Sequence, residues 1–216
     1  MASLVRLARG RGHPLAAALW VSTARLLVGY LLTCAIGVLL GLALWRWDDL
    51  DRLFGPVFLG LQALPSVCWV PLAMLLPLLG ASERGIIFVT VMGSTWAVAM
   101  ALRDGLRALP TIYRRSGLML GARGWKLYSH VLLPSSLPAL VASLRLGFSF
   151  AWRSLMGAEI LFKAVLPGLG FLLKSGQSDA AQIVGIMIVM VVVGMLADRW
   201  LFARVQARVQ ARFGLS

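Results

Sequence analysis

Two ionisable residues, Arg153 and Glu159, lie deep inside the apolar segment 137–162, which also contains Arg145. A charged side chain at membrane depth costs about 2.5–3.5 kcal/mol on insertion scales, so such residues usually pair inside the protein or line a polar path. Arg145 and Glu159 would be about 21 Å apart along one helix and cannot pair with each other. Glu159 therefore either pairs with a donor on another helix or belongs to a translocation path. Arg153 and Glu159 are both path candidates.

Segment 53–79 is the most irregular apolar segment, because it contains four prolines: Pro56, Pro65, Pro71 and Pro77. Proline removes a backbone hydrogen-bond donor and kinks a helix. Where a helix is broken at membrane depth, the freed N–H and C=O groups need hydrogen-bond partners from protein or water. The segment therefore either lines a polar interior or is a kinked packing helix that lines nothing. If it lines an interior, the path candidates are side chains near its middle: Gln62, Ser66, Trp69 and Pro71.

The composition indicates a membrane protein. Of 216 residues, 60% are hydrophobic and 13% are charged, whereas soluble domains have about 45–50% apolar and about 25% charged residues. This apolar content excludes a disordered chain. It also excludes a soluble nucleic-acid binder, in spite of the net charge of +13. Cys34 and Cys68 lie inside apolar runs, which excludes a disulfide scaffold.

The sequence offers no set of residues for catalysis or metal binding within the membrane. His13 and His130 both fall outside the apolar segments, and no cluster of His, Cys and carboxylate residues occurs. Nucleophilic catalysis needs a base beside its nucleophile, and a metal site needs such a cluster. We therefore predict that the chain is not an enzyme and that it binds no cofactor or metal itself.

Five segments are long and apolar enough to cross a bilayer, which takes about 20 residues: 16–44, 53–79, 85–102, 137–162 and 183–202. They predict an all-α, polytopic membrane bundle that forms one domain over residues 1–216. Lys and Arg gather on one side of this bundle: Arg46, Arg52, six residues in 103–130 and four in 199–212, against six on the other. Because cytoplasmic loops carry an excess of Lys and Arg, we place 103–130 and the C-terminus in the cytoplasm.

Segment 103–134 connects the third and fourth apolar segments. Its sequence indicates a short basic helix, a break at Gly121, a second amphipathic helix and then Leu133-Pro134. A structureless loop of this length is uncommon in a compact domain. The segment therefore indicates a rigid helix–turn–helix that protrudes from the membrane and could serve as a docking site.

This segment resembles the cytoplasmic signature of ABC importer permeases, which reads Glu-Ala-Ala, three residues, Gly, nine residues, Ile-x-Leu-Pro. Gly121 occupies the glycine position, Val131 the isoleucine position and Leu133-Pro134 the Leu-Pro position, without a gap. The opening triad differs: where the family has Glu-Ala-Ala, this chain has Arg115, Ser116 and Gly117.

The resemblance extends to the nitrate/sulfonate/taurine branch of these permeases, in segments 61–72, 120–122, 144–147 and 151–161. It implies the fold of a type I ABC importer permease in the bacterial inner membrane. Such a permease would move a small anion, for example nitrate, a sulfonate or taurine, by alternating access. The residues that the resemblance implies for coupling to an ATPase are Arg115, Ser116, Gly117, Gly121, Ala122, Val131, Leu133 and Pro134.

The same resemblance implies the partners. They are a second copy of the permease, two cytoplasmic ABC ATPase subunits that bind ATP and Mg, an extracytoplasmic substrate-binding protein and the lipid bilayer, with no nucleic acid. The alternative function is an ATP-independent secondary transporter or channel. That alternative predicts repeats with paired broken helices, and only segment 53–79 is conspicuously broken.

Overall fold

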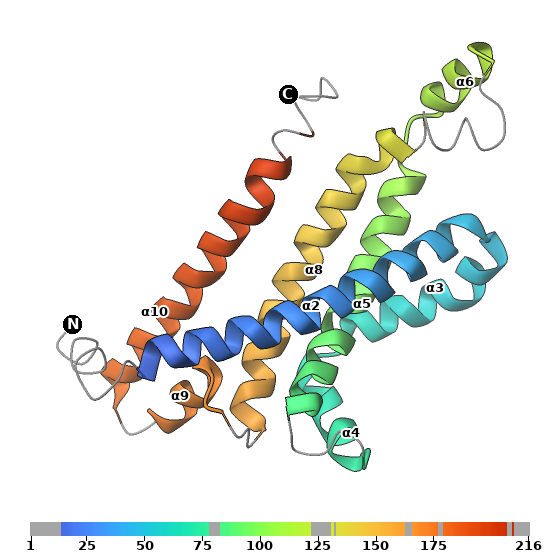
Figure 1. Ribbon diagram of the computed structural model, residues 1–216. Helices are drawn as coiled ribbons and strands as arrows, with labels where there is room; N and C mark the ends of the chain where they lie inside the picture. The colour runs from blue at the N-terminus through green and yellow to red at the C-terminus, as the bar shows by residue number, and fades with distance from the viewer. Residues whose placement is uncertain are drawn as a thin grey trace.

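The structure, a computed structural model, describes residues 14–77, 83–121, 131, 133–162, 166–176, 179–206 and 209. Every regular element in these residues is a helix, which confirms the all-α prediction (Figure 1). In chain order the elements are α2 (Pro14–Arg46), α3 (Asp48–Ala63), the 3-10 turn η1 (Ser66–Cys68), α4 (Trp69–Leu75), α5 (Glu83–Arg107), α6 (Thr111–Met119), α8 (Leu133–Leu161), α9 (Leu169–Ser175), α10 (Ala180–Ala197) and the π-helix η3 (Asp198–Ala203).

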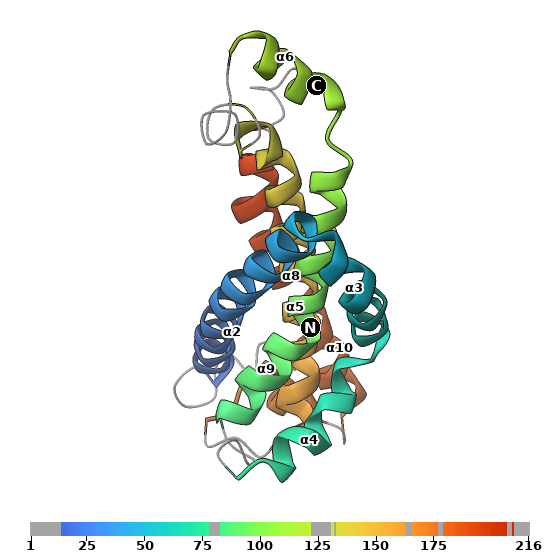
Figure 2. The same cartoon turned by 90° about the vertical axis from the view of Figure 1, so that its right-hand side faces the viewer.

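Helix α5 packs along both α2 and α8 and forms the centre of the bundle (Figures 1 and 2). Glycines on its two neighbours allow this close approach. A Cβ at Gly37 of α2 would lie 2.7 Å from the Cβ of Val98, and a Cβ at Gly147 of α8 would collide with the same valine. Small residues at helix contacts let membrane helices gain packing contacts. Buried apolar side chains fill the rest of this contact: Ile86, Val89, Leu102, Phe148 and Leu155.

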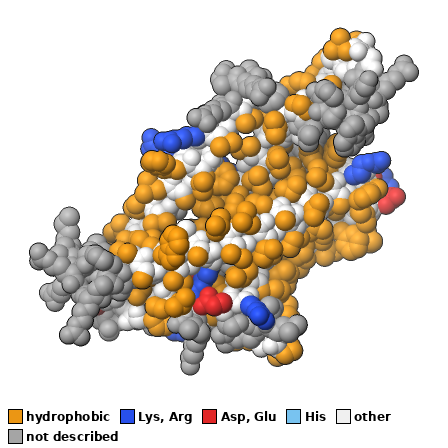
Figure 3. Space-filling model, in the orientation of Figure 1, with side chains coloured by type: hydrophobic (Ala, Val, Ile, Leu, Met, Phe, Trp, Pro, Cys, Tyr) orange, Lys and Arg blue, Asp and Glu red, His pale blue; other side chains and the backbone are white. Residues whose placement is uncertain are grey.

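The outward faces of α2 and α10 are apolar and exposed. The exposed side chains include Leu27, Leu31 and Leu39 on α2, and Met187, Val191 and Leu196 on α10. Figure 3 shows hydrophobic side chains over most of the face in view. A helix that is apolar all round is typical of a membrane span or a protein core, and these outward faces fit contact with lipid.

Among the described residues, three helical stretches are long and apolar enough to cross a membrane: 15–46, 83–107 and 180–206. The bent pair formed by α3 with η1 and α4 would be a fourth span. Helix α8, which covers the predicted segment 137–162, does not reach the same level of hydropathy because it carries Arg145, Arg153 and Glu159. Its 29 residues are nevertheless about 43 Å long, and its crossing of the membrane stays a prediction.

Candidate translocation site

The chain breaks between α3 and α4, at the centre of the proline-rich segment. The stretches Asp48–Ala63 and Ser66–Leu75 meet at an angle of 99°. Leu64 and Pro65 connect them in extended conformations, with ψ angles of 129° and 135°. Proline disfavours a helical conformation in the residue before it, so Pro65 explains the break. Pro71 is tolerated in the first turn of α4, where backbone donors have no partner within the helix.

A pocket of about 330 Å³ lies at this bend. Its walls come from residues 62–67 of the bend, from α5 and from α8, and the residues outside the bend are Gly93, Phe150, Arg153 and Ser154. Three predicted path residues therefore meet here from the second and fourth apolar segments: Gln62, Ser66 and Arg153. The other path candidates do not line this pocket: Trp69, Pro71 and Glu159.

Arg153 is an exposed side chain at the pocket, and its guanidinium group is positioned by residues of its own helix. The guanidinium carbon lies 4.4 Å from the centroid of the Phe150 ring, and Nε donates to the carbonyl oxygen of Ser149 at 3.4 Å. None of the ion pairs among the described residues includes Arg153. Arg145, two turns earlier, instead pairs with Asp198 at 2.6 Å. The pocket therefore holds an arginine whose charge is not neutralised by a described carboxylate.

Several buried polar atoms on the helices around the bend have no protein partner. In the part of the chain that the structure describes, these atoms are Gln62 Oε1, Trp69 Nε1, Thr95 Oγ1 and Trp96 Nε1. They belong to α3, α4 and α5. Buried polar atoms without a partner are uncommon in folded proteins and call for a water, an ion or a functional explanation. Two of these four residues, Gln62 and Trp69, are predicted path residues.

Gly93 brings the walls of the pocket together, and this contact gives a testable prediction. A Cβ at position 93 would lie 2.9 Å from the Cβ of Ser66 and 3.0 Å from the Cβ of Ser154. We expect Gly93→Ala to lower the free energy of unfolding by about 1–3 kcal/mol through overpacking, measured as a lower melting temperature in detergent. Gly60→Ala is the matched control, because a Cβ there has nothing within 4 Å and helices favour alanine over glycine. Equal melting temperatures for both variants would contradict this packing.

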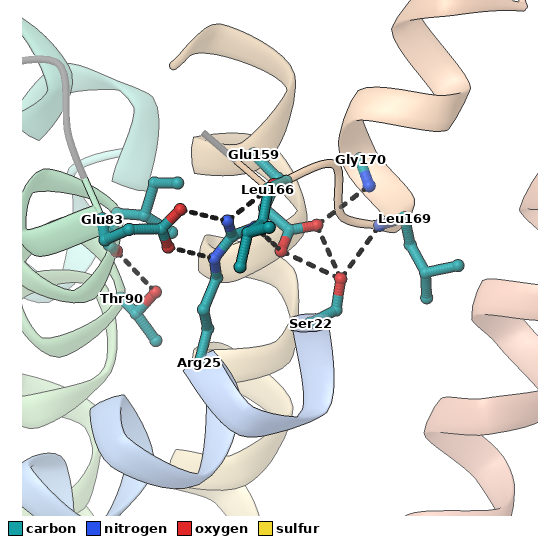
Figure 4. Close-up of polar contacts among 9 residues, drawn as sticks. Ser22, Arg25, Glu83, Thr90, Glu159, Leu166, Leu169 and Gly170 are labelled. Atoms are coloured by element: carbon teal, nitrogen blue, oxygen red, sulfur yellow. Dashed lines mark hydrogen bonds and ion pairs between the residues drawn. The ribbon is translucent and has the colours of Figure 1, made fainter. Parts of the chain in front are cut away.

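Glu159 lies near the C-terminal end of α8, inside a buried cluster of polar groups (Figure 4). Its side chain is 1% exposed. The carboxylate accepts hydrogen bonds from Arg25 Nη1 at 2.8 Å, from Ser22 Oγ at 2.8 and 2.9 Å, and from the backbone N–H of Gly170 at 3.0 Å. The structure thus gives Glu159 an interhelix pair, which was the alternative to a place on the path.

Arg25 extends this cluster to α5 and to the segment before α9. Its Nε and Nη2 donate to the two carboxylate oxygens of Glu83, each at 2.5 Å, and Nη2 also donates to the carbonyl oxygen of Leu166 at 2.8 Å. The backbone N–H of Leu169 donates to Ser22 Oγ at 2.9 Å, and a Cβ at Gly168 would collide with the Glu159 carboxylate. The cluster therefore ties α2, α5, α8 and the start of α9 into one unit.

The partners Arg25 and Glu83 were missed by sequence reasoning, although a signal for Arg25 was present. Arg25 is the only charged residue in segment 16–44, and Glu159 is the only acidic residue in segment 137–162. A lone cation and a lone anion on two membrane helices are expected to pair. Glu83 gave no such signal, because it stands at the start of its helix, where an acidic residue is common.

The first part of the predicted coupling segment protrudes from the bundle as α6 (Figures 1 and 2). Of the residues aligned with the family triad, Arg115 and Ser116 are exposed and Gly117 is buried. Gly121 follows α6 with a φ of +79°, which is a left-handed conformation that glycine adopts without strain. A residue in this conformation cannot continue the α6 helix.

The second part of the coupling segment is described only where it joins α8. The carbonyl oxygen of Val131 accepts a hydrogen bond from Ser135 Oγ at 2.7 Å, Leu133 begins α8, and Pro134 lies in its first turn. Ala122 and the second helix expected in 122–130 lie outside the described residues.

A network of charges joins the start of α3 to the last turns of α5, next to α6. Asp51 accepts from Arg103 Nη1 at 2.6 Å and from Arg107 Nη1 at 2.8 Å. Arg107 also pairs with Asp48 at 3.0 Å, and Arg103 pairs with Asp104 at 2.6 Å. The base of the coupling segment is therefore connected to the helix that leads to the bend. Sequence reasoning missed this network, because it treated these arginines as an orientation signal and a docking surface and did not pair them with Asp48 or Asp51.

Comparisons with known proteins agree with this arrangement. The family described as "Binding-protein-dependent transport system inner membrane component" matches residues 34–209. A putative ABC transporter permease protein of Methanocaldococcus jannaschii is 28% identical over 183 residues, covering 84% of this chain and 67% of its own length. The nitrate import permease protein NrtB of Synechocystis sp. is 27% identical over 189 residues, covering 85% and 66%. The bicarbonate transport system permease protein CmpB of Synechocystis sp. is 27% identical over 180 residues, covering 82% and 63%.

The chain spans about two thirds of the length of these curated relatives. Among solved structures, a chain of the MetNI methionine ABC transporter in inward-facing conformations superposes with a TM-score of 0.75 at 18% identity. That superposition covers 91% of this chain and 96% of the other, and it confirms the fold implied by the signature around Gly121. The chain belongs to the family of inner-membrane components of binding-protein-dependent transport systems, the permeases of ABC importers.

Proposed function

We propose that this chain is the permease subunit of an ATP-driven importer and that small anions cross the membrane beside the bend between α3 and α4. The observation that carries this proposal is the pocket at the bend, where Gln62, Ser66 and Arg153 come together. Discontinuous helices commonly form the substrate sites of membrane transporters. Irregular backbone at membrane depth also belongs where protein or a water-filled cavity surrounds it.

The substrate class is supported by the charge at the pocket and by the relatives. Arg153 carries a positive charge that pairs with no described acidic residue. Two relatives are named for the transport of nitrate and of bicarbonate, and both substrates are small anions. Sulfonates, and the zwitterion taurine through its sulfonate group, also present an oxyanion group to a guanidinium.

Coupling to ATP would take place at α6 and the residues that follow it. Apolar side chains on this protrusion are exposed, among them Ile112 at 61% and Met119 and Leu120 at 87% each. Exposed apolar groups beside Arg115 favour docking into a groove on a cytoplasmic ATPase subunit. Two such subunits would bind ATP and Mg and carry out hydrolysis, so this chain itself would not be an enzyme. The Asp51 network would transmit movement of α6 to α3 and the bend.

The remaining partners lie on the other faces of the bundle. A second copy of the chain would complete the path, and an extracytoplasmic binding protein would deliver substrate at the end where Glu83 and Glu159 lie. The C-terminal end of α10 and α6 lie toward the same end of the molecule (Figures 1 and 2), which supports a cytoplasmic C-terminus. The chain would then be a multi-pass protein of the bacterial inner membrane.

Uptake into proteoliposomes tests this function. The chain, reconstituted with its ATPase and binding-protein partners, is expected to accumulate labelled nitrate or bicarbonate only when hydrolysable ATP is present on the ATPase side. A non-hydrolysable ATP analogue should abolish accumulation. Equal uptake without ATP would contradict the proposal and favour the secondary transporter or channel.

A further inference from the structure

The pocket at the bend has one ionisable side chain among its lining residues, and that side chain is Arg153. Other arginines within the three central helices bind carboxylates, whereas Arg46 and Arg84, at helix ends, are exposed and make no ion pair with a described residue. Arg25 binds Glu83 and Glu159, Arg103 binds Asp51, and Arg145 binds Asp198. Arg153 is exposed at the pocket within α8, and a charge without a partner on a membrane helix is costly and is usually explained by function. The pocket therefore holds a positive charge that no described carboxylate neutralises.

The geometry leaves the outer edge of this guanidinium free. The Phe150 ring lies 4.4 Å from its central carbon, and the only hydrogen bond that Arg153 makes to described residues is from Nε to Ser149. The N–H donors of its Nη1 and Nη2 groups are therefore available to a ligand. A guanidinium edge presents two parallel N–H groups that match two oxygens of one oxyanion, and stacking on an aromatic ring fixes its plane.

Three neutral polar residues line the same pocket as Arg153. The hydroxyls of Ser66 and Ser154 line it, and neither hydroxyl makes a hydrogen bond to a described residue. Gln62 also lines it, with Oε1 buried and without a partner. Because the oxygen and nitrogen of a glutamine amide are assigned rather than seen, a rotated amide would place an N–H donor at this buried position. The pocket then offers one charge and up to three neutral donors.

We propose that this pocket is a binding subsite for a small monovalent oxyanion of the nitrate or bicarbonate type, held by Arg153 and by the Ser66, Ser154 and Gln62 side chains. A single positive charge balances a single negative charge, and the lining contains no carboxylate that would compete with the ligand or attract a cation. The subsite depends on the proposed function in one respect: it would lie on the proposed translocation path. The binding itself needs no ATP and no partner protein.

Charge-selective labelling of the purified chain tests the subsite. Ala63→Cys is the reporter, because Ala63 lines the pocket, is exposed and contributes no donor. It is placed in a Cys34→Ala/Cys68→Ala background in nanodiscs of phosphatidylcholine, which has no net charge. The thiol reacts with an anionic sulfonatoethyl or a cationic trimethylammonioethyl methanethiosulfonate. The ratio of the two rates cancels any change in the reactivity of the thiol itself.

The expected result is that the anionic reagent is favoured over the cationic one relative to a free cysteine. Arg153→Gln should lower this ratio about fivefold at low ionic strength. Nitrate should slow labelling by the anionic reagent in a saturable way, more than chloride at equal concentration. Arg204→Gln is the matched control, since Arg204 is also exposed and stacked on an aromatic ring, at 4.5 Å from Trp200, but it follows η3 and does not line the pocket. The Arg204→Gln variant should show the same rate ratio and the same protection by nitrate as the reporter protein.

Two results would overturn the subsite. One is a rate ratio that Arg153→Gln leaves unchanged. The other is a ratio that depends on Arg153 while nitrate and chloride act alike, which would show an electrostatic field without a binding site. If uptake still requires ATP in either case, the permease function stands and only the subsite fails. If labelling behaves as expected but uptake needs no ATP, the subsite stands and the importer proposal fails.

Discussion

Glu159→Ala is expected to lower the free energy of unfolding by about 3–5 kcal/mol, because it breaks a buried ion pair, leaves Arg25 with only the partly exposed Glu83, and leaves buried donors without an acceptor. Arg25 is 5% exposed and Glu159 is 1% exposed, so solvent screens this pair little. The substitution also removes the acceptor for Ser22 Oγ and for the backbone N–H of Gly170. Unfolding in mixed micelles, followed by tryptophan fluorescence, measures the change.

Glu83→Ala is the control for this prediction. It removes the second carboxylate bound by Arg25, but Glu83 is 38% exposed, so its loss should cost less than half as much as the loss of Glu159. Glu159→Gln keeps the shape of the side chain and part of its hydrogen bonding, and its effect should lie between those of the two alanine variants. A Glu159→Ala protein as stable as the wild type would show that this cluster does not hold the bundle together.

Gly121→Val is expected to reduce ATP-driven uptake about tenfold while the membrane bundle stays folded. The φ of +79° at Gly121 is a conformation that costs an L-residue roughly 1–2 kcal/mol, and β-branched residues are least suited to it. A population shift of 1.4 kcal/mol corresponds to about a factor of ten. The strain would displace α6 from the docking position that we propose for it, so uptake by the reconstituted complex is the measurement.

Comparison of substituents at position 121 separates conformational strain from steric collision. A Cβ there would meet nothing within 4 Å, so side-chain size alone should matter little. Asparagine visits the left-handed region more readily than other non-glycine residues, so Gly121→Asn should retain more uptake than Gly121→Ala, and Gly121→Val should retain least. An unchanged melting temperature of the detergent-purified chain is expected for all three. Full uptake by Gly121→Val would mean that the reversal after α6 is not needed for coupling.

The sequence was sufficient to predict helices, their approximate positions and the break in segment 53–79. Periodicity and proline chemistry act locally, so Pro65 could be recognised as a candidate breaker without knowledge of its neighbours. The break at Gly121 could be predicted for the same local reason. The number of membrane crossings was harder to predict, because α8 carries charged residues. The free-energy cost of placing them in a membrane depends on the groups that they contact. Pairing with Asp198 and Arg25 lets Arg145 and Glu159 lie in a helix that is less apolar than the three candidate spans.

The site could be predicted only in part, because its parts come from distant segments. Gln62, Ser66 and Arg153 were named from residue type and depth, and the structure brings them to one pocket. The role of Gly93 could not be seen in advance, because it depends on how closely α5 approaches Ser66 and Ser154. Trp69 and Pro71 share the bend but not the pocket, since a helix places neighbouring residues on different faces.

Access to Ser66 in the assembled complex tests the central claim, that the bend lies on a path opened to one side of the membrane at a time. In a Cys34→Ala/Cys68→Ala background, Ser66→Cys is expected to react with an impermeant thiol reagent from the cytoplasmic side without nucleotide. With ATP trapped on the ATPase and the binding protein present, it should react from the opposite side. Equal labelling from either side in both states, or none in either, would contradict a translocation path at this bend.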